Sequence, residues 1–484
     1  MSPESETIPP NPGSETSATT VTAEAAAEPP RRGRRTRTDL TTGSIPKKLF
    51  SQAWPQSVEG MLNILDQSVD LFWASRLPAG FRAIAGVGVA QTFTQFAMFA
   101  RMGLDEAMSA MMARAIGGRN ISLANRILFQ ALLVNIVYSL AMVLIGVFLT
   151  DFFLSIFGIS EEIHAQTAMY MRIQFLGMAT QNLRMFTGRG LQAAGDVTVP
   201  LRATFVSRAI HIALTPFLIF GWGFFPEMGL PGSSLANVIA QLAGVAMNLY
   251  ALASGQSRLH LGLKGNDFDF PLMWKMLKIG GPASIRGTER ASSQLALLGV
   301  AAPFGDVTLA AYSLTRRLEN FSSFGGMGIS QAAGVMVGQN LGADKPERAK
   351  QAIWWACGYV SGLNILIRGL FFVFPIGIIM IFTKDSDVVD LTVQWVRLQL
   401  IGSFFMGLQN TFQQAFNGAG DTLAPLVVTL LGVWVIEVPA SIWLSHTALG
   451  PLALGIGNIL GMSSRLLFYL PYYFNGRWLR MKVI

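Results

Sequence analysis

Four polar side chains recur at helical spacing along one apolar stretch near the N-terminal end of the chain. They lie four, three and four residues apart, which places them on one face of an α-helix over about 16 Å of its axis. The stripe consists of Glu59, Asn63, Asp66 and Asp70. Because a charged group in hydrocarbon is costly, such a stripe must face protein or water, and each acid in it is a candidate for ion or substrate binding.

Two interpretations of these acids remain open. Asp66 and Asp70 could pair with arginines as structural buried ions. Alternatively, one of the two carboxylates takes up and releases a cation. A desolvated carboxylate favours its neutral, protonated form, so a proton gradient could switch it between its two states.

Arginines are frequent within the other apolar stretches: Arg184, Arg208, Arg286, Arg290, Arg316, Arg317 and Arg368. Glu289 follows Arg286 by three residues, which favours an ion pair within one helix, and Glu319 stands in the same relation to Arg316. Bases still outnumber acids, and a cavity acidic on one wall and basic on the other would bind zwitterions or anions. The substrate-cavity candidates are Glu59, Asn63, Gln181, Arg286, Glu289 and Gln409.

The stretches that hold these residues have the length and composition of transmembrane helices. Of 484 residues, 51% are hydrophobic and 13% are charged, against about 25% charged in soluble domains. Apolar segments of about 20 to 30 residues are each long enough to span a bilayer. They predict an all-α membrane protein with helices near 50–76, 83–114, 124–149, 163–190, 198–222, 230–254, 271–302, 307–338, 347–382, 388–416, 423–445 and 451–474.

Lysine and arginine gather in alternate loops and in the stretch before the first predicted helix. Because cytoplasmic loops carry the excess of basic residues, we expect a multi-pass protein of the cell membrane with both termini in the cytoplasm. Residues 1–44 lack an apolar period, which predicts a disordered tail. The sequence contains no nucleotide-binding loop, metal-ligand cluster or catalytic triad signature, so we expect no enzyme, no cofactor, no metal and no nucleic-acid partner.

The two halves of the chain resemble each other. Ala194-Gly195-Asp196 and Pro200 match Ala419-Gly420-Asp421 and Pro425, which lie 225 positions later, and Pro55 matches Pro282 at an offset of 227. Six helices in each half make the repeats parallel, with substrate bound between them. We therefore expect two pseudo-symmetric six-helix bundles, 45–256 and 257–484, in a monomer. Pro55 and Pro282 should bend their helices toward the central cleft.

These motifs resemble the multidrug and toxic compound extrusion (MATE) family over about residues 45 to 475. Val69-Asp70 after Pro55 looks like the family's first-helix motif, and Gly195-Asp196 with Pro200 is similar to its Gly-Asp turns. The resemblance implies an antiporter that exports organic cations and other small amphiphiles by using an H⁺ or Na⁺ gradient. An organic-anion exporter of the same fold and a lipid-linked flippase of the same superfamily are the alternatives. An intramembrane enzyme would need paired catalytic acids or a zinc motif.

The resemblance also implies a cation-coupling set. In the DinF-like branch, which this sequence is nearer, the acid at the position of Asp70 joins an Asn and an Asp of helix five and a Thr of helix six. His211, Thr215 and Asn237 occupy those three positions here, and Asp66 lies one turn away. An imidazole beside one acid favours a proton over Na⁺. In the NorM-like positions, Arg290 and Met406 replace acids, so no cation site is expected in the C-terminal half.

Overall fold

The computed structural model describes residues 39–484 except 78–79, 157–160, 263–266, 482 and 484. Residues 1–38, most of the predicted tail, lie outside the described residues. The part of the chain that is described is helical and contains no strand. The helices before residue 257 are α1 Ile45–Ala74, α2 Gly80–Gly117, α3 Ile121–Ile156, α4 Glu161–Ala193, α5 Thr198–Phe220 and α6 Leu230–Ala253.

The remaining helices are α7 Phe270–Ala301, η1 Ala302–Phe304, α8 Asp306–Gly342, α9 Pro346–Val373, α10 Pro375–Ile379, α11 Ser386–Ala419, α12 Leu423–Leu430, η2 Leu431–Glu437, α13 Val438–Ser445, α14 Leu452–Asn475 and η3 Arg477–Arg480. Each predicted span overlaps one of these helices or one continuous run of them. The span predicted at 347–382 differs, because Pro375 cannot continue α9 and begins the short helix α10 instead. The span at 423–445 contains a π-helical turn, η2, between α12 and α13.

Local sequence explains where several helices begin and end. Asp269 caps α7 by accepting a hydrogen bond from the backbone N–H of Leu272, and Asp385 caps α11 in the same way. The glycines of the repeated Gly-Asp turns, Gly195 and Gly420, have φ values of +85° and +88°. Only glycine adopts such angles without strain, so the duplicated motif supplies the same helix stop in both halves.

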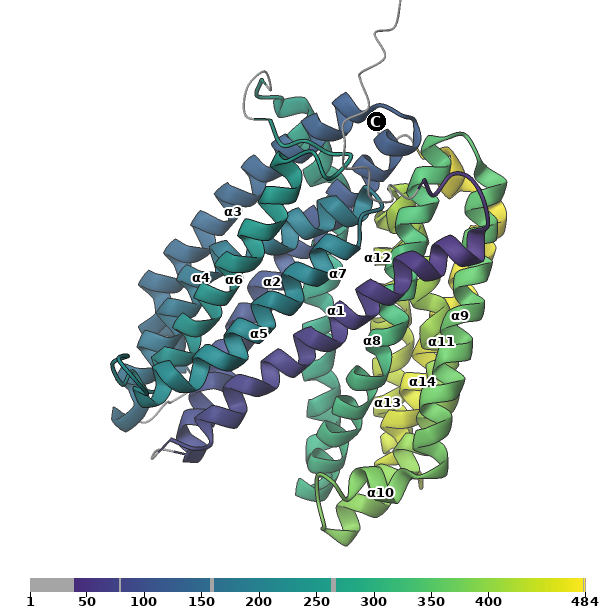
Figure 1. Cartoon of the computed structure of the whole chain (residues 1–484). Coiled ribbons are helices and arrows are strands. Elements are labelled where there is room, and N and C mark those ends of the chain that lie inside the picture. The colour runs from purple at the N-terminus through teal and green to yellow at the C-terminus, as the bar shows by residue number, and fades with distance from the viewer. Residues whose placement is uncertain (1–38, 78–79, 157–160, 263–266, 482, 484) are drawn as a thin grey trace, which may run out of the picture. The chain divides into compact units, whose positions relative to one another are not determined.

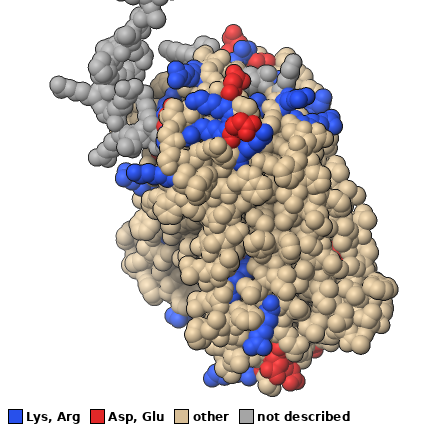
Figure 2. Space-filling view, turned by 90° about the vertical axis from the view of Figure 1, so that its right-hand side faces the viewer, with Lys and Arg blue, Asp and Glu red and all other residues tan. Residues whose placement is uncertain are grey.

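Length and hydropathy by themselves mark six of the described helices as able to cross a membrane: α3, α5, α6, α9, α12 through α13, and α14. Buried charged residues occur on both groups of helices, for example Arg208 on α5 and Asp66 on α1. Figure 2 shows one face of the molecule, on which most Lys, Arg, Asp and Glu side chains gather at the two ends and a broad, largely uncharged band lies between them. Large apolar side chains such as Phe148 and Leu366 are exposed, as lipid-facing residues must be.

The two halves meet through their first two helices. In Figure 1, α1 runs diagonally beside α5 and α8. It also packs on α9, and α2 packs on α7 and α8. The predicted boundary at 256/257 falls between α6 and α7, and the division into two lobes stays a prediction. Pro55 and Pro282 lie inside α1 and α7, and their bends toward a cleft also stay a prediction.

The ends of α2 and α8 form a contact that is repeated across the two halves. Gly117 and Gly342 are repeat partners. A Cβ on Gly117 would lie 1.9 Å from the carbonyl oxygen of Gln339, and one on Gly342 would lie 2.1 Å from that of Arg114. Arg114 donates to the carbonyl oxygen of Ala419, at 3.0 Å, and Gln339 donates to that of Ala193, at 2.8 Å. At this end of the molecule, close backbone packing and side chain to backbone hydrogen bonds therefore join the two halves.

Candidate functional site

The acidic stripe of α1 faces α4, α5 and α6. Asp66 accepts a hydrogen bond from Arg208 through Oδ2, and its Oδ1 lies 2.6 Å from Nδ1 of His211. The imidazole of His211 is fully buried, at 0% exposure. Asp66 is therefore one member of a buried ion pair with Arg208.

Asp70 lies on the other side of the same imidazole. Its Oδ1 is 3.4 Å from Nε2 of His211, which has no hydrogen-bond partner among the described residues. Asp70 accepts a hydrogen bond from Oγ of Ser233 on α6 and a longer one, at 3.4 Å, from the Tyr170 hydroxyl on α4. One imidazole thus lies between two buried carboxylates, which is an arrangement that can hold and transfer a proton.

The structure does not bring the whole predicted coupling set together. Thr215 donates to the carbonyl oxygen of His211 in its own helix, at 2.6 Å, and Asn237 accepts from Gln241, at 3.0 Å. Among the described residues, neither side chain makes a hydrogen bond to a carboxylate. Sequence reasoning missed Ser233 and Tyr170, because a hydroxyl in an apolar helix gives no signal of its own. Ser233 does lie four residues before Asn237, on the same face of α6.

The rest of the stripe is also held by side chains of neighbouring helices. Glu59 accepts hydrogen bonds from Gln192, at 2.8 Å, and from Thr204, at 3.0 Å, and Arg184 lies 3.9 Å away. Asn63 accepts from Nη2 of Arg208, at 2.9 Å. In the N-terminal half, acids on the first helix thus meet bases on α4 and α5.

The C-terminal half instead contains a cavity of about 160 Å³. Charged side chains of α7, α8, η2 and α14 line it: Arg286, Glu289, Arg290, Arg316, Glu319, Glu437 and Arg465. Arg316 pairs with Glu319 at 3.0 Å, as the spacing predicts, and Arg465 pairs with Glu437 at 2.6 Å. Phe99, Met327 and Met406 add apolar walls.

The predicted ion pair between Arg286 and Glu289 is wrong. Arg286 donates both to Glu106 of α2, at 2.7 and 2.9 Å, and to Asn417, at 3.4 Å. Nη2 approaches both carboxylate oxygens of Glu106 and Nη1 donates to Asn417, so groups on two other helices engage the guanidinium in place of the neighbour on its own helix. Oε1 of Glu289 is left without a hydrogen-bond partner among the described residues.

The other two cavity candidates differ in position. Gln409 lines the same cavity, and its Oε1 has no hydrogen-bond partner in the described part of the chain. Gln181 does not line it, and its Nε2 lies 3.9 Å from the sulfur of Met98. Of the predicted cavity residues, the C-terminal cavity therefore gathers Arg286, Glu289 and Gln409, whereas Glu59 and Asn63 belong to the N-terminal cluster.

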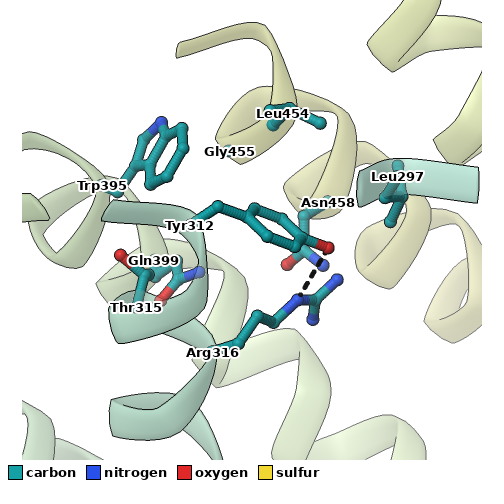
Figure 3. Close-up of a pocket in the computed structure, with 9 residues that line it drawn as sticks. All are labelled: Leu297, Tyr312, Thr315, Arg316, Trp395, Gln399, Leu454, Gly455 and Asn458. Atoms are coloured by element: carbon teal, nitrogen blue, oxygen red, sulfur yellow. Dashed lines mark hydrogen bonds between the residues drawn. The ribbon is translucent and has the colours of Figure 1, made fainter. Parts of the chain in front are cut away.

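A small polar pocket adjoins this cavity and shares Arg316 and Asn458 with it. Figure 3 shows the Tyr312 hydroxyl pointing toward Arg316, whose Nε donates to it at 3.1 Å, with Asn458 beside them. The pocket holds about 10 Å³, which is room for one water molecule.

A second cavity, of about 190 Å³, lies where the halves meet. Met102 and Met327, which are repeat partners, line both cavities. Glu106 and its repeat partner Gln331 also line it, and Arg189 donates to Gln331 at 2.6 Å. Residues related by the repeat thus line the same space, where helices of both halves meet.

Comparison with known proteins gives the same architecture. A family model described as MatE matches residues 55–217 and 288–443. The probable multidrug resistance protein NorM of Thermotoga maritima is 24% identical over 91% of this chain and 94% of its own length. A protein of Shewanella oneidensis described as an FAD transporter is 25% identical over 87% of this chain and 91% of its own.

A solved structure described as the outward-facing conformation of a multidrug resistance MATE family transporter covers 93% of this chain and 100% of its own. Its TM-score is 0.84 at 18% identity, a likeness that shows the fold. Members of this family are transporters and not enzymes. The duplicated helices, the Gly-Asp turns and the family model together show that this multi-pass membrane protein belongs to the MATE family of small-molecule transporters.

Proposed function

We propose that this chain is a secondary active antiporter that exports organic amphiphiles or cations in exchange for protons, and that Asp66, His211 and Asp70 hold the exchanged proton. The single observation that supports it is the buried imidazole between two carboxylates, 2.6 Å from Asp66 and 3.4 Å from Asp70. The proposal assigns coupling to the N-terminal half, the half that a resemblance to the DinF-like branch would imply.

Protonation of His211 changes how strongly α1 is held to α5. The imidazolium donates from both ring nitrogens, so it binds Asp66 and Asp70 at once. Loss of the proton removes one donor and leaves two neighbouring carboxylates that repel each other. Because α1 also packs on α8 and α9, a change at this cluster reaches the other half, and the two halves can then move relative to each other.

The ligands around Asp70 favour a proton over Na⁺. Hard cations such as Na⁺ take several oxygen ligands. Both oxygens of Asp66 are already engaged by Arg208 and His211. Asp70 has the hydroxyls of Ser233 and Tyr170 nearby, but Thr215 and Asn237 bond elsewhere. Few oxygen atoms are therefore free to bind Na⁺, and the imidazole of His211 occupies the centre of the site.

The test uses purified protein in sealed liposomes, with pH and Na⁺ gradients imposed separately and accumulation of a fluorescent organic cation as the measurement. Native protein should respond to the pH gradient. Asp70→Asn and His211→Gln should abolish that response, because each removes one member of the proton-holding set. Circular dichroism and monodisperse elution would show that the variants are folded and inserted.

Asp151→Asn is the matched control, because it removes an acid whose ion pair with Arg172 is exposed at the end of α3. A surface pair of this kind contributes about 0–1 kcal/mol, so its transport should equal that of the native protein. Transport that follows Na⁺ and ignores pH, or native rates in Asp70→Asn, would refute the proposal.

The charge asymmetry of the loops supports placing both termini in the cytoplasm. Cysteines introduced at the exposed positions of Lys384 and Glu347 test the orientation, since the native Cys357 is buried. Lys384→Cys should react with an impermeant reagent applied to intact cells, and Glu347→Cys only after permeabilisation. The opposite result would reverse the topology.

A further inference from the structure

Most charges that line the C-terminal cavity neutralise one another. Arg316 pairs with Glu319, Arg465 with Glu437 and Arg286 with Glu106. Two charged side chains remain. Arg290 makes no side-chain hydrogen bond or ion pair with the side chains that the structure describes, and Glu289 makes no ion pair with them. One base and one acid therefore stay available on the wall of the same cavity.

The repeat explains why Arg290 lacks a partner. The offset of 227 that relates Pro55 to Pro282 also relates Asn63 to Arg290. In the N-terminal half, Asn63 accepts from Arg208, whereas the equivalent of Arg208, 225 positions later, is Val433. Val433 and Arg290 line the same cavity. The N-terminal half therefore has a hydrogen bond between Asn63 and Arg208, whereas at the equivalent positions the guanidinium of Arg290 faces a cavity that Val433 also lines.

Hydrogen-bond acceptors without donors lie on the wall of the same cavity. Oε1 of Glu289, Oε1 of Gln409 and Oδ1 of Asn458 lack hydrogen-bond partners among the described residues. Their side chains are more than nine-tenths buried, with residues at 7%, 7% and 4% exposure, and all three line the cavity. A buried acceptor without a donor is costly. A ligand that brings donors would satisfy these oxygens.

We propose that this cavity binds a small zwitterionic amphiphile, with its oxyanion group held by Arg290 and its ammonium group by Glu289 and the nearby amide oxygens. A guanidinium binds a carboxylate or a phosphate through parallel N–H donors. Phe99, Met102, Met327 and Met406 supply the apolar wall, with methionines that adapt to ligands of different shape. The inference rests on the proposed export function, because it names the class of the exported substrate.

Equilibrium binding tests the site without any ion gradient. Tritiated tryptophan, a zwitterion, binds to the purified protein, and unlabelled tryptophanamide, an isosteric cation without the carboxylate, competes for it. With native protein the amide should compete roughly tenfold less well than unlabelled tryptophan, because it loses the charge-assisted contact with Arg290. In Arg290→Gln the two competitors should become equal, and Arg290→Lys should restore part of the preference.

Glu289→Gln separates the two contacts, because it should weaken tryptophan and tryptophanamide alike by removing the partner of their common ammonium group. Arg397→Gln is the matched control. Arg397 is an exposed arginine of α11 that does not line the cavity, so this variant should keep the native preference. Absence of tryptophan binding, equal competition in the native protein, or a preference that survives in Arg290→Gln would overturn the proposal. Failure of gradient-driven transport with intact binding preference would overturn only the coupling.

Discussion

The two halves of this transporter share a repeat but distribute their charges in opposite ways. In the N-terminal half the first helix carries acids, Glu59 and Asp66, and the neighbouring helices carry Arg184 and Arg208. At the positions equivalent to Glu59 and Asn63, the first helix of the C-terminal half carries Arg286 and Arg290, and at the position equivalent to Asp66 it carries Ser293. The acids that line its cavity are Glu289, which is next to Arg290 on the same helix, and Glu319 and Glu437 on α8 and η2.

This difference separates two tasks. The N-terminal cluster is filled, because hydrogen bonds join its charges across four helices. The C-terminal cluster surrounds a cavity of about 160 Å³, on whose wall Glu289 and Arg290 make no ion pair with the described residues. The N-terminal cluster, whose side chains bond to one another, can bind a small ion such as a proton, which changes the charge of its ligands. The C-terminal cluster surrounds a cavity and can bind a whole molecule. Duplication therefore preserved the helices while the polar chemistry of the halves diverged.

The largest difference in stability should appear between two variants that each lose an arginine, one in the N-terminal half and one in the C-terminal half. Arg208→Gln leaves Asp66 with one partner fewer and should lower the free energy of unfolding by about 3–5 kcal/mol, because breaking a buried pair strands its partner. Arg290→Gln removes a charge without a described partner and should leave stability nearly unchanged. Thermal unfolding of both purified variants, followed by size-exclusion fluorescence, measures the difference. Equal losses would show that the C-terminal arginine is as firmly paired as the N-terminal one.

An intermediate effect should appear where the halves remain equivalent. Gly117→Ala and Gly342→Ala each push a methyl group against a backbone carbonyl at a distance near 2 Å and should cost about 1–3 kcal/mol through overpacking. The two costs should be similar, since the contacts are related by the repeat. Gly362→Ala is the control, because a Cβ there meets nothing within 4 Å. It should be neutral or slightly stabilising in the same thermal assay. If Gly342→Ala caused no loss of stability, the two contacts would not be equivalent.

The smallest difference between paired variants should separate two hydroxyls of the N-terminal half. Ser233→Ala removes a donor to Asp70 and should cost about 1.5–3 kcal/mol, the contribution of a hydrogen bond to a charged group. Thr215→Val removes a hydrogen bond to a carbonyl of its own helix and should cost about 1 kcal/mol. Proton-driven uptake should fall in Ser233→Ala and persist in Thr215→Val. If uptake fell in Thr215→Val and persisted in Ser233→Ala, Thr215 rather than Ser233 would belong to the proton-coupling residues.

Sequence reasoning reached the helices and the central pair of site residues. The apolar spans located each long helix, and the stripe on α1 located Asp66 and Asp70. Motif spacing also located His211, because helix-five residues keep a constant offset from the Gly-Asp turn. It did not find Ser233 or Tyr170, whose hydroxyls carry no charge, and it paired Arg286 with Glu289 because only neighbours in one helix are visible in a sequence. Contacts between helices depend on rotation and depth, which periodicity does not specify.

The amino-acid sequence by itself determined the family, the helical membrane fold, the repeat and the polar face of α1, because all of these follow from apolar length, helical period and turn chemistry. Only the tertiary structure decided which charges meet. It placed one imidazole between Asp66 and Asp70, turned Arg286 toward Glu106 and left Arg290 on a cavity wall. The physical reason is that an ion pair between helices depends on angstrom-scale packing of residues far apart in the chain, and similar residue types at repeated positions can end in a filled cluster or an open one.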